Sequence, residues 1–270
     1  MLLPLTDRGA LGAKTRLRDA VSSPPETGER KVLRSTRSGS LARSLSHIGS
    51  PEAFAREFAV SRETVDRLSI YADLLRQWGK VQDLVAPSTL DDIWHRHISD
   101  SAQLWPLLPT GAKTGADLGS GAGFPGLVLA ILGRDRQNFK MHLVEASNRK
   151  CSFLREVARR CGAPVEIECI RIEQLATQSR IGAVEFVTAR ALAPLASLLG
   201  LAKPLLSDTT RALFLKGRDA SKEVSEAQKV WRFQSELTAS RTDPAGRIVE
   251  IWNLRSLEGS RDGDQSGTGQ

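Results

Sequence analysis

The chain has 270 residues, of which 40% are hydrophobic and 26% charged, and its formal net charge is +7. This composition is typical of a soluble globular protein of one or two domains, and it excludes collagen-like and wholly disordered chains. No apolar run approaches the roughly 18 residues that cross a membrane, and the apolar start is too short for a secretion signal. Three cysteines without a Cys-x-x-Cys pair and four histidines without metal-ligand spacing disfavour a disulfide scaffold and a metal site.

The two ends of the chain differ from its middle in composition. Residues 1–50 are rich in Ser, Arg, Gly and Pro, and they carry nine basic against four acidic side chains. Their weak apolar periodicity predicts a disordered basic extension, and such a charge can attract a polyanion such as RNA. Residues 256–270 contain four glycines, which predicts a disordered tail.

Residues 51–109 have the pattern of a small helical region. Ser61 is a typical N-cap residue, and apolar side chains recur after it at steps of three and four residues. These side chains, which would form one apolar helix face, are Val65, Leu68, Tyr71, Leu75 and Trp78. A second helix is predicted from Leu90 to Leu104, bounded by Pro87 and Pro106.

Short apolar strands alternate with helical patterns from Gly115 onward, which indicates an α/β domain over residues 110–255. Helices are predicted at Leu127–Leu132 and around Phe153–Val157. The predicted strands are Gly115–Leu118, Met141–Glu145, Val165–Cys169, Val184–Thr188, Ala212–Leu215 and Ile248–Trp252. We therefore expect a mostly parallel sheet covered on both faces. The last two strands lack a clear crossover helix, so an antiparallel edge is also expected.

The most informative segment is the glycine loop, Asp117-Leu-Gly-Ser-Gly-Ala-Gly-Phe-Pro-Gly126, which follows a predicted strand and opens a predicted helix. Glycine lets the backbone turn sharply and approach a ligand closely. Its last six residues match the Gly-x-Gly-x-x-Gly dinucleotide fingerprint, which keeps an NAD-dependent oxidoreductase open. Asp117 and Pro125 instead favour a sulfonium nucleoside, which needs no pyrophosphate cradle. Glu145, 19 residues after Gly126, is placed to accept hydrogen bonds from ribose hydroxyls.

These residues resemble the first motif of class I S-adenosylmethionine-dependent methyltransferases, and specifically the RsmG (GidB) family of bacterial 16S ribosomal RNA guanine-N7 methyltransferases. Further segments agree with that family in order and spacing. They are Arg96-His-Ile-Ser-Asp-Ser101, Thr188-Ala-Arg-Ala191 and Leu215-Lys-Gly217. The resemblance covers residues 60–254 and implies a Rossmann-like fold with a mostly parallel sheet.

The resemblance implies methyl transfer to N7 of the guanine at position 527, in the 530 loop of 16S rRNA, either free or in the 30S subunit. Guanine N7 carries a free lone pair, so no proton has to be removed before attack. We therefore expect no general base and assign no catalytic residue; alignment and proximity would provide the rate. We expect a cytoplasmic monomer that uses no metal.

The cofactor and RNA residues follow from the same resemblance. Glu145 would bind the ribose of S-adenosylmethionine, and Ile172 and Glu173 would lie along its adenine. The full cofactor set is Asp117, Gly119, Ser120, Gly121, Phe124, Glu145, Ile172, Glu173 and Arg190. The candidate RNA contacts, for which a solvated surface charge is the alternative, are Arg96, His97, Arg149, Lys150, Lys216 and Arg218.

One segment departs from the family pattern. After the tryptophan the family usually carries Trp-Asn-Lys-x-x-Asn-Leu, whereas this chain has Gly79 and Asp83 in place of the two asparagines. The departure leaves room for an RNA-binding protein that has the methyltransferase fold without turnover. A methyltransferase of small molecules is a further alternative, which the basic charge disfavours.

Overall fold

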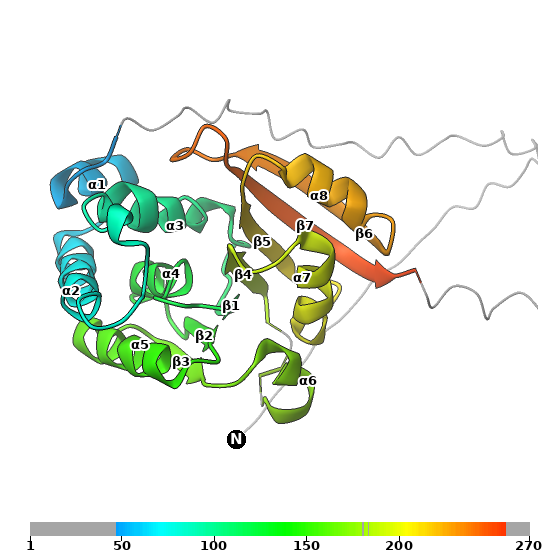
Figure 1. The fold of residues 1–270 in the computed structure, drawn as a ribbon, viewed down its shortest axis with the longest axis horizontal. Coiled ribbons are helices and arrows are strands. Elements are labelled where there is room, and N and C mark those ends of the chain that lie inside the picture. Colours follow the sequence, from blue (N-terminus) through cyan, green and yellow to red (C-terminus); the bar gives the residue numbers. More distant parts are fainter. Residues whose placement is uncertain (1–46, 180, 183, 258–270) are drawn as a thin grey trace, which may run out of the picture. The chain divides into compact units, whose positions relative to one another are not determined.

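The computed structural model describes residues 47–179, 181–182 and 184–257 (Figure 1). Its centre is a seven-stranded sheet of order β3-β2-β1-β4-β5-β7-β6. The strands are β1 (Thr114–Leu118), β2 (Lys140–Val144), β3 (Val165–Glu168), β4 (Phe186–Arg190), β5 (Arg211–Lys216), β6 (Trp231–Ala239) and β7 (Arg247–Ser256). The first five strands are parallel, whereas β7 pairs antiparallel with β5 and β6 with β7. The predicted parallel sheet with an antiparallel edge is confirmed.

The sequence pattern missed β6 and placed β4 two residues too early. β6 is the edge strand, and its side chains alternate between half-buried and exposed, so it lacks the apolar run that marked the inner strands. Residues Val184 and Glu185 precede β4, and the strand runs instead to Arg190. Arg190 therefore lies at the carboxyl end of its strand.

Eight α-helices are present in the described residues. They are α1 (Pro51–Phe58), α2 (Arg62–Trp78), α3 (Asp100–Ala102), α4 (Gly126–Gly133), α5 (Asn148–Cys161), α6 (Leu175–Gln178), α7 (Leu195–Ala202) and α8 (Ala220–Ala227). Ser61 caps α2 as predicted, because its hydroxyl accepts the N–H of Thr64 at 3.3 Å.

The continuous helix predicted from Leu90 to Leu104 is wrong in extent. The backbone N–H of Leu90 bonds the carbonyl of Pro87 and closes a short turn there. A π-helical segment, Trp94–Ser99, follows and leads directly into α3. This helical path carries Arg96, His97 and Asp100.

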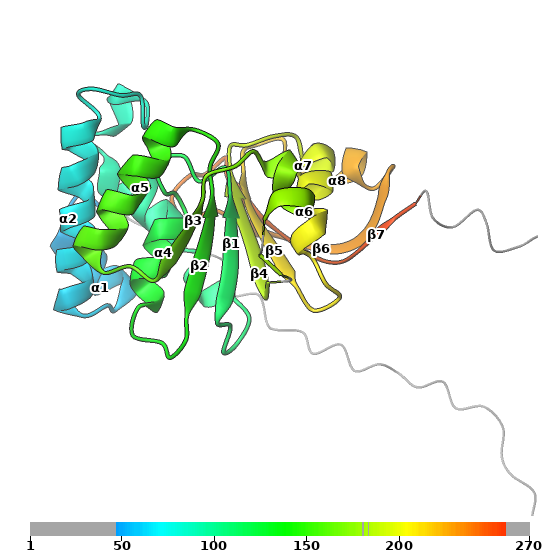
Figure 2. The ribbon, with the colours of Figure 1, turned by 90° about the horizontal axis from the view of Figure 1, so that it is seen from below.

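Two hydrophobic cores cover the two faces of the sheet. In Figure 2, α2, α4 and α5 lie on one side of the sheet, and α7 and α8 lie on the other. Side chains of β5 alternate between the cores: Leu213 faces the first, and Phe214 the second. Such alternation is the expected result of the two-residue period of a strand whose faces are both buried.

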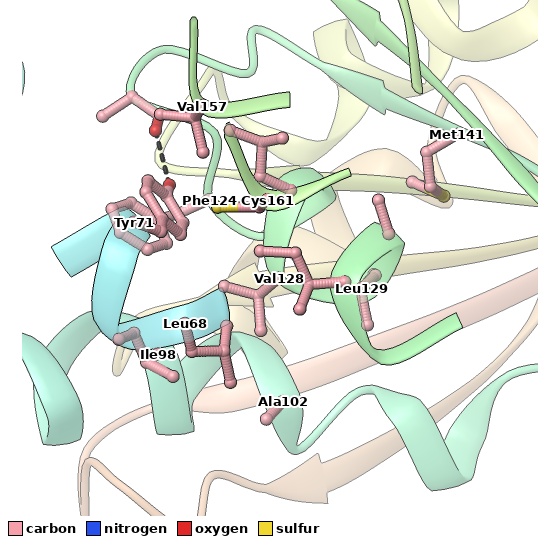
Figure 3. Packing of buried hydrophobic residues seen from close by; sticks show 14 of the residues in the cluster. Leu68, Tyr71, Ile98, Ala102, Phe124, Val128, Leu129, Met141, Val157 and Cys161 are labelled. Carbon is pink, nitrogen blue, oxygen red and sulfur yellow. Dashed lines mark hydrogen bonds between the residues drawn. The ribbon is translucent and has the colours of Figure 1, made fainter. Parts of the chain in front are cut away.

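The helical region shares the first core with the sheet domain. Leu68 and Tyr71 of α2 are fully buried, and they pack with Val128 of α4 and Val157 of α5 (Figure 3). The division into a helical region of residues 51–109 and a sheet domain of 110–255 stays a prediction. The predictions for residues 1–46 and 258–270 lie outside the described residues, and β7 extends through Ser256.

The described helices include none that is both long and apolar enough to cross a membrane.

The close packing of the sheet predicts opposite effects for two glycine substitutions. A Cβ on Gly115 of β1 would lie 2.2 Å from the Phe186 ring, so Gly115→Ala should lower the free energy of unfolding by about 1–3 kcal/mol. Gly200 lies on the exposed side of α7, where alanine favours the helix more than glycine does. Gly200→Ala should therefore raise the free energy of unfolding by about 0.5–1 kcal/mol. Urea unfolding of both variants checks the prediction, and equal effects would contradict it.

Candidate active site

The carboxyl ends of the parallel strands β1, β2 and β4 lie side by side at one edge of the sheet. Leu118 of β1 pairs with Val144 of β2 on one side and with Ala189 of β4 on the other. The strand order reverses between β1 and β4, and in open parallel sheets ligands bind beyond the carboxyl ends at such a point. The glycine loop, Glu145 and Arg190 directly follow or end these strands.

The glycine loop adopts a backbone that other residues rarely adopt. Gly119, Gly121 and Gly123 have φ values of +64°, +57° and +98°. The N–H of Ser120 donates to the carbonyl of Val144 at 3.0 Å, and the Tyr71 hydroxyl donates to that of Ala122 at 2.5 Å. The loop is therefore held by β2 on one side and by α2 on the other.

Asp117 supports the glycine loop from inside the protein. Its side chain is fully buried, and its carboxylate accepts the N–H of Gly126 at 3.2 Å and the hydroxyl of Thr188 at 2.8 Å. Burial raises the pKa of Asp117 to about 6, against the hydrogen bonds that favour its charged form. The carboxylate thus connects the end of β1 to the start of α4 and to β4.

Glu145 connects the glycine loop to the start of α5. Its Oε2 accepts the N–H of Gly121 at 2.9 Å, and its Oε1 accepts the N–H of Ser147 at 2.8 Å. The residue is 8% exposed. Each carboxylate oxygen can accept a second hydrogen bond, so Glu145 can still receive the two hydroxyls of a ribose.

Phe124 lies inside a stack of rings. It stacks on Tyr71 (Figure 3), with a centroid separation of 5.1 Å. It also stacks on His97, with a centroid separation of 4.9 Å. The guanidinium of Arg190 lies 5.1 Å from the centre of the same ring. The stack joins the helical region, the glycine loop and β4, and it leaves Phe124 only 4% exposed.

His97 is held as a neutral ring. Arg190 Nη2 donates to His97 Nδ1 at 3.0 Å, so the ring carries its proton on Nε2, which faces the Thr89 hydroxyl at 2.8 Å. Burial, and then the charges of Arg190 and Arg96, lower the pKa of His97 to about 3. His97 is therefore an acceptor for Arg190 and carries no charge of its own at neutral pH.

Arg190 is oriented by three groups of the helical region. Nη1 donates to the carbonyl of Arg96 at 3.2 Å and lies 3.6 Å from a carboxylate oxygen of Asp100, while Nη2 reaches His97. Within the described residues, the hydrogen bonds of Arg190 use one N–H of Nη1 and one N–H of Nη2. Among these residues they leave without a hydrogen-bond partner the Nε–H, the second Nη2–H and the second Nη1–H, and Nη1 also forms the ion pair with Asp100. Nε and Nη2 share one edge of the guanidinium, here called its open edge, and such an edge suits a carboxylate or phosphate.

The backbone after Arg190 is strained. Ala191 has a φ of +49°, in the left-handed region that side chains with a Cβ disfavour. Such strain concentrates at functional sites, where the surrounding structure enforces it. The strain here lies where β4 meets the glycine loop, because a Cβ on Gly119 would contact Leu192 at 2.7 Å.

A cavity of about 890 Å³ opens beside Arg190, over the carboxyl ends of β4 and β5. The cavity is lined by three of the predicted RNA contacts, Arg96, His97 and Lys216. Arg218 is exposed and does not line the cavity itself, but its neighbours Gly217 and Asp219 do. Lys216 is already engaged, since its ammonium lies 2.7 Å from Glu223 and donates to the carbonyl of Ala193. The volume of the cavity is within the range of small-molecule sites.

The other predicted RNA contacts lie elsewhere. Arg149 and Lys150 line a smaller groove of about 420 Å³ at the start of α5, together with residues 79–83, the segment that departs from the family pattern. Ile172 is half-buried and Glu173 exposed on the turn after β3. The structure thus brings together Phe124, His97 and Arg190, and it separates them from the basic residues of α5.

For three contributors to the site the sequence predicted no role, although Asp100 lies in the Arg96–Ser101 segment that resembles the family. Tyr71 was expected only as an apolar helix residue, yet its hydroxyl holds the loop. Asp100 and Thr242, which bond each other at 2.6 Å, lie 142 residues apart in the chain. Spacing rules describe neighbours within one element, so they do not reveal such pairs.

In the described part of the chain, no group of three His, Cys, Asp or Glu side chains is arranged to hold a metal ion.

Residues 64–244 match the model of the protein family described as rRNA small subunit methyltransferase G (GidB). A protein named ribosomal RNA small subunit methyltransferase G from Parvibaculum lavamentivorans is 48% identical over 208 residues, which cover 77% of this chain and 91% of that protein. A protein of the same name from Rhodospirillum centenum is 50% identical over 198 residues, covering 73% and 88%.

A solved structure supports the fold. The crystal structure of a putative O-methyltransferase from Klebsiella pneumoniae has a TM-score of 0.50 and 14% sequence identity, and the match covers 75% of this chain and 96% of that one. The predicted class I methyltransferase fold, a Rossmann-like sheet with an antiparallel edge, is confirmed.

The neutral state of His97 predicts a pH-dependent stability. Between pH 7 and 5 the unfolded chain protonates its histidine, whereas folded His97 does not, so acid favours unfolding. The difference in unfolding free energy between wild type and His97→Gln should shrink by ~2 kcal/mol from pH 7 to pH 5.

Urea unfolding of both proteins at several pH values measures this difference. Asp117, with its pKa raised to about 6, has the opposite slope, but it is present in both proteins and cancels. A difference that does not change with pH would contradict the assignment of a buried neutral ring.

Proposed function

The chain belongs to the rRNA small subunit methyltransferase G family, and from this premise we propose that it methylates N7 of a guanine in the 530 loop of 16S rRNA, at position 527. Family membership makes it an rRNA methyltransferase that uses S-adenosylmethionine. The target atom and the target base are the proposed part. The observation that best supports the site is Glu145, which bonds the glycine loop and still has acceptor capacity for a ribose.

The residues at the sheet edge fit this cofactor. Apart from Gly121 itself, its two chain neighbours and the Gly119 carbonyl oxygen at 3.7 Å, no heavy atom of the described residues lies within 4 Å of where a Cβ on Gly121 would stand. The loop therefore leaves space on its open side. When bound, the cofactor supplies an electrophilic methyl group on a sulfonium.

We assign the cofactor contacts as follows. Gly119 and Gly121 would approach the cofactor with their backbone, Glu145 would accept the ribose hydroxyls, and Ile172 and Glu173 would border the adenine. Arg190 would turn its open guanidinium edge toward the site. Asp117, Ser120 and Phe124 would act from beneath, because each is nearly or fully buried.

The reaction requires alignment rather than proton transfer. The N7 lone pair of guanine forms the new N–C bond as the C–S bond breaks, and the positive charge passes to the base. No general base is needed, because N7 carries no proton that would have to be removed. The task of the chain is to hold both reactants in line and to exclude water, which can account for a large share of the rate.

The cavity beside Arg190 is the place we assign to the target guanine. It adjoins the cofactor edge through Arg190 and Ala191, and its volume admits a nucleobase. An enzyme that modifies a base in RNA takes it out of its stack into such a pocket. Arg96 at its rim and the basic residues of α5 would contact phosphates.

We propose a cytoplasmic monomer that acts on 16S rRNA, free or within the 30S subunit. The family places methyl transfer ahead of the NAD-dependent alternative. An RNA-binding protein without turnover is the alternative that the assay below tests, since Gly79 and Asp83 line the groove at α5.

The proposal predicts a specific product. Incubation with tritiated S-adenosylmethionine and 16S rRNA or 30S subunits from cells lacking the enzyme should label one guanine in the 530 loop, mapped by N7-specific cleavage and primer extension. Label at another nucleotide would contradict the target. Cofactor binding without label would favour the protein without turnover.

The role of Glu145 is tested by cofactor binding. Glu145→Gln places an amide where a carboxylate now accepts two backbone N–H groups, so we expect cofactor affinity to fall about tenfold or more. Glu166→Gln on the surface of β3 is the control, because Glu166 pairs with Lys140 away from the loop. Calorimetric titration with S-adenosylmethionine measures both, and equal affinities would contradict the assignment.

The salt dependence of RNA binding distinguishes basic side chains that contact RNA phosphates from those that are already paired with a carboxylate of the protein. Arg149→Ala should reduce the slope of log K against log[salt] by about 0.7–0.9 for one lost phosphate contact. Lys216→Met should change the slope less, because Glu223 already neutralises Lys216. Filter binding at several salt concentrations measures both slopes, and the reverse order would exclude Arg149 as a contact.

A further inference from the structure

Asp100 is a half-buried carboxylate whose two oxygens have different partners. Oδ1 accepts the Thr242 hydroxyl at 2.6 Å and the Gln103 amide at 2.8 Å. Oδ2 faces Nη1 of Arg190 at 3.6 Å, and the side chain is 17% exposed. The two hydrogen bonds to Oδ1 fix the plane of the carboxylate, and so they decide where Oδ2 lies.

The turn between β6 and β7 is the support for this arrangement. Gln103 accepts the backbone N–H of Arg241 at 2.8 Å and donates to the Ser240 hydroxyl at 3.1 Å. The ring of His95 bonds the Thr242 carbonyl at 3.1 Å. These contacts hold Thr242 beside Asp100, although Thr242 lies far from Asp100 in the sequence.

Arg190 depends on Asp100 for its only ion pair among the described residues. Its other partners, the Arg96 carbonyl and the neutral ring of His97, accept hydrogen bonds but carry no negative charge. Arginine side chains have many rotamers, and the ion pair adds an attraction between opposite charges that the two neutral acceptors do not provide.

We propose that Asp100, held by Thr242 and Gln103, is a positioning residue that orients the Arg190 guanidinium so that its open edge faces the methyl-transfer site. The turn between β6 and β7 is then part of the active-site architecture. This inference rests on the proposed function, in which Arg190 borders the cofactor. Asp100 acts through Arg190 and contacts neither substrate nor cofactor.

Asp100→Asn tests the inference, because asparagine keeps an acceptor for Thr242 and Gln103 and removes the charge that faces Arg190. We expect kcat to fall tenfold or more, with KM for RNA changed less than twofold and the melting temperature nearly retained. Thr242→Val, which removes the donor and keeps the shape, should lower kcat in the same direction by a smaller factor.

Glu57→Gln is the matched control. Glu57 pairs with Arg241 of the same turn at 2.6 Å, but it does not contact Asp100 or Arg190. If the turn mattered only for folding, Glu57→Gln and Asp100→Asn would reduce stability and activity together. Such parallel losses would overturn the inference, as would an unchanged kcat in Asp100→Asn.

A measurement on the free protein keeps the inference separate from the proposed reaction. The Nη hydrogens of Arg190 in wild type should give slowly exchanging ¹⁵N-resolved signals, which broaden in Asp100→Asn and Thr242→Val as the guanidinium rotates more freely. Unchanged signals would overturn the positioning role. Failed methyl transfer in wild type with these NMR changes intact would contradict the proposed function alone.

Discussion

The buried carboxylate of Asp117 is the interaction on which the geometry of the site depends. It bonds the N–H of Gly126 and the hydroxyl of Thr188, so β1, α4 and β4 meet at one anchor. A Cβ on Gly126 would lie 2.7 Å from this carboxylate, which explains why glycine stands there. The glycine loop begins at Asp117 and comes back to the Asp117 carboxylate at Gly126, so the backbone of the loop must reverse sharply. The glycines with left-handed backbone conformations permit this reversal.

The helical region completes the site rather than lying beside it. Tyr71 and His97 both stack on Phe124, and the three groups that orient Arg190 come from residues 96–100. Arg190 itself belongs to β4, so the sheet supplies the cation and the helical region supplies its orientation. Loss of the packing between α2 and α4 would therefore disturb the site as well as the core.

The sequence supported most of the fold because the fold follows local patterns. Strand and helix periods, the Ser61 cap and the glycine loop are each visible within a few residues. The exceptions have physical reasons: β6 is a half-exposed edge strand, and the segment before Asp100 contains a π-helical stretch that no apolar period marks. At the site, Glu145 was visible through its place after a strand, and Arg190 through the family resemblance. The supports from Tyr71, Asp100 and Thr242 were not, because they depend on contacts between distant segments.

The charges around Arg190 are arranged in a way that suits a cationic methyl donor. Two like unit charges 4 Å apart repel by about 4 kcal/mol at the effective dielectric of a protein surface, so an unpaired guanidinium would oppose a sulfonium nearby. Asp100 offsets that field, and His97 adds none because its ring is neutral. The hydrogen-bond donors of the open guanidinium edge remain in place. In the proposed reaction, Arg190 can therefore orient its partners by geometry without repelling the donor.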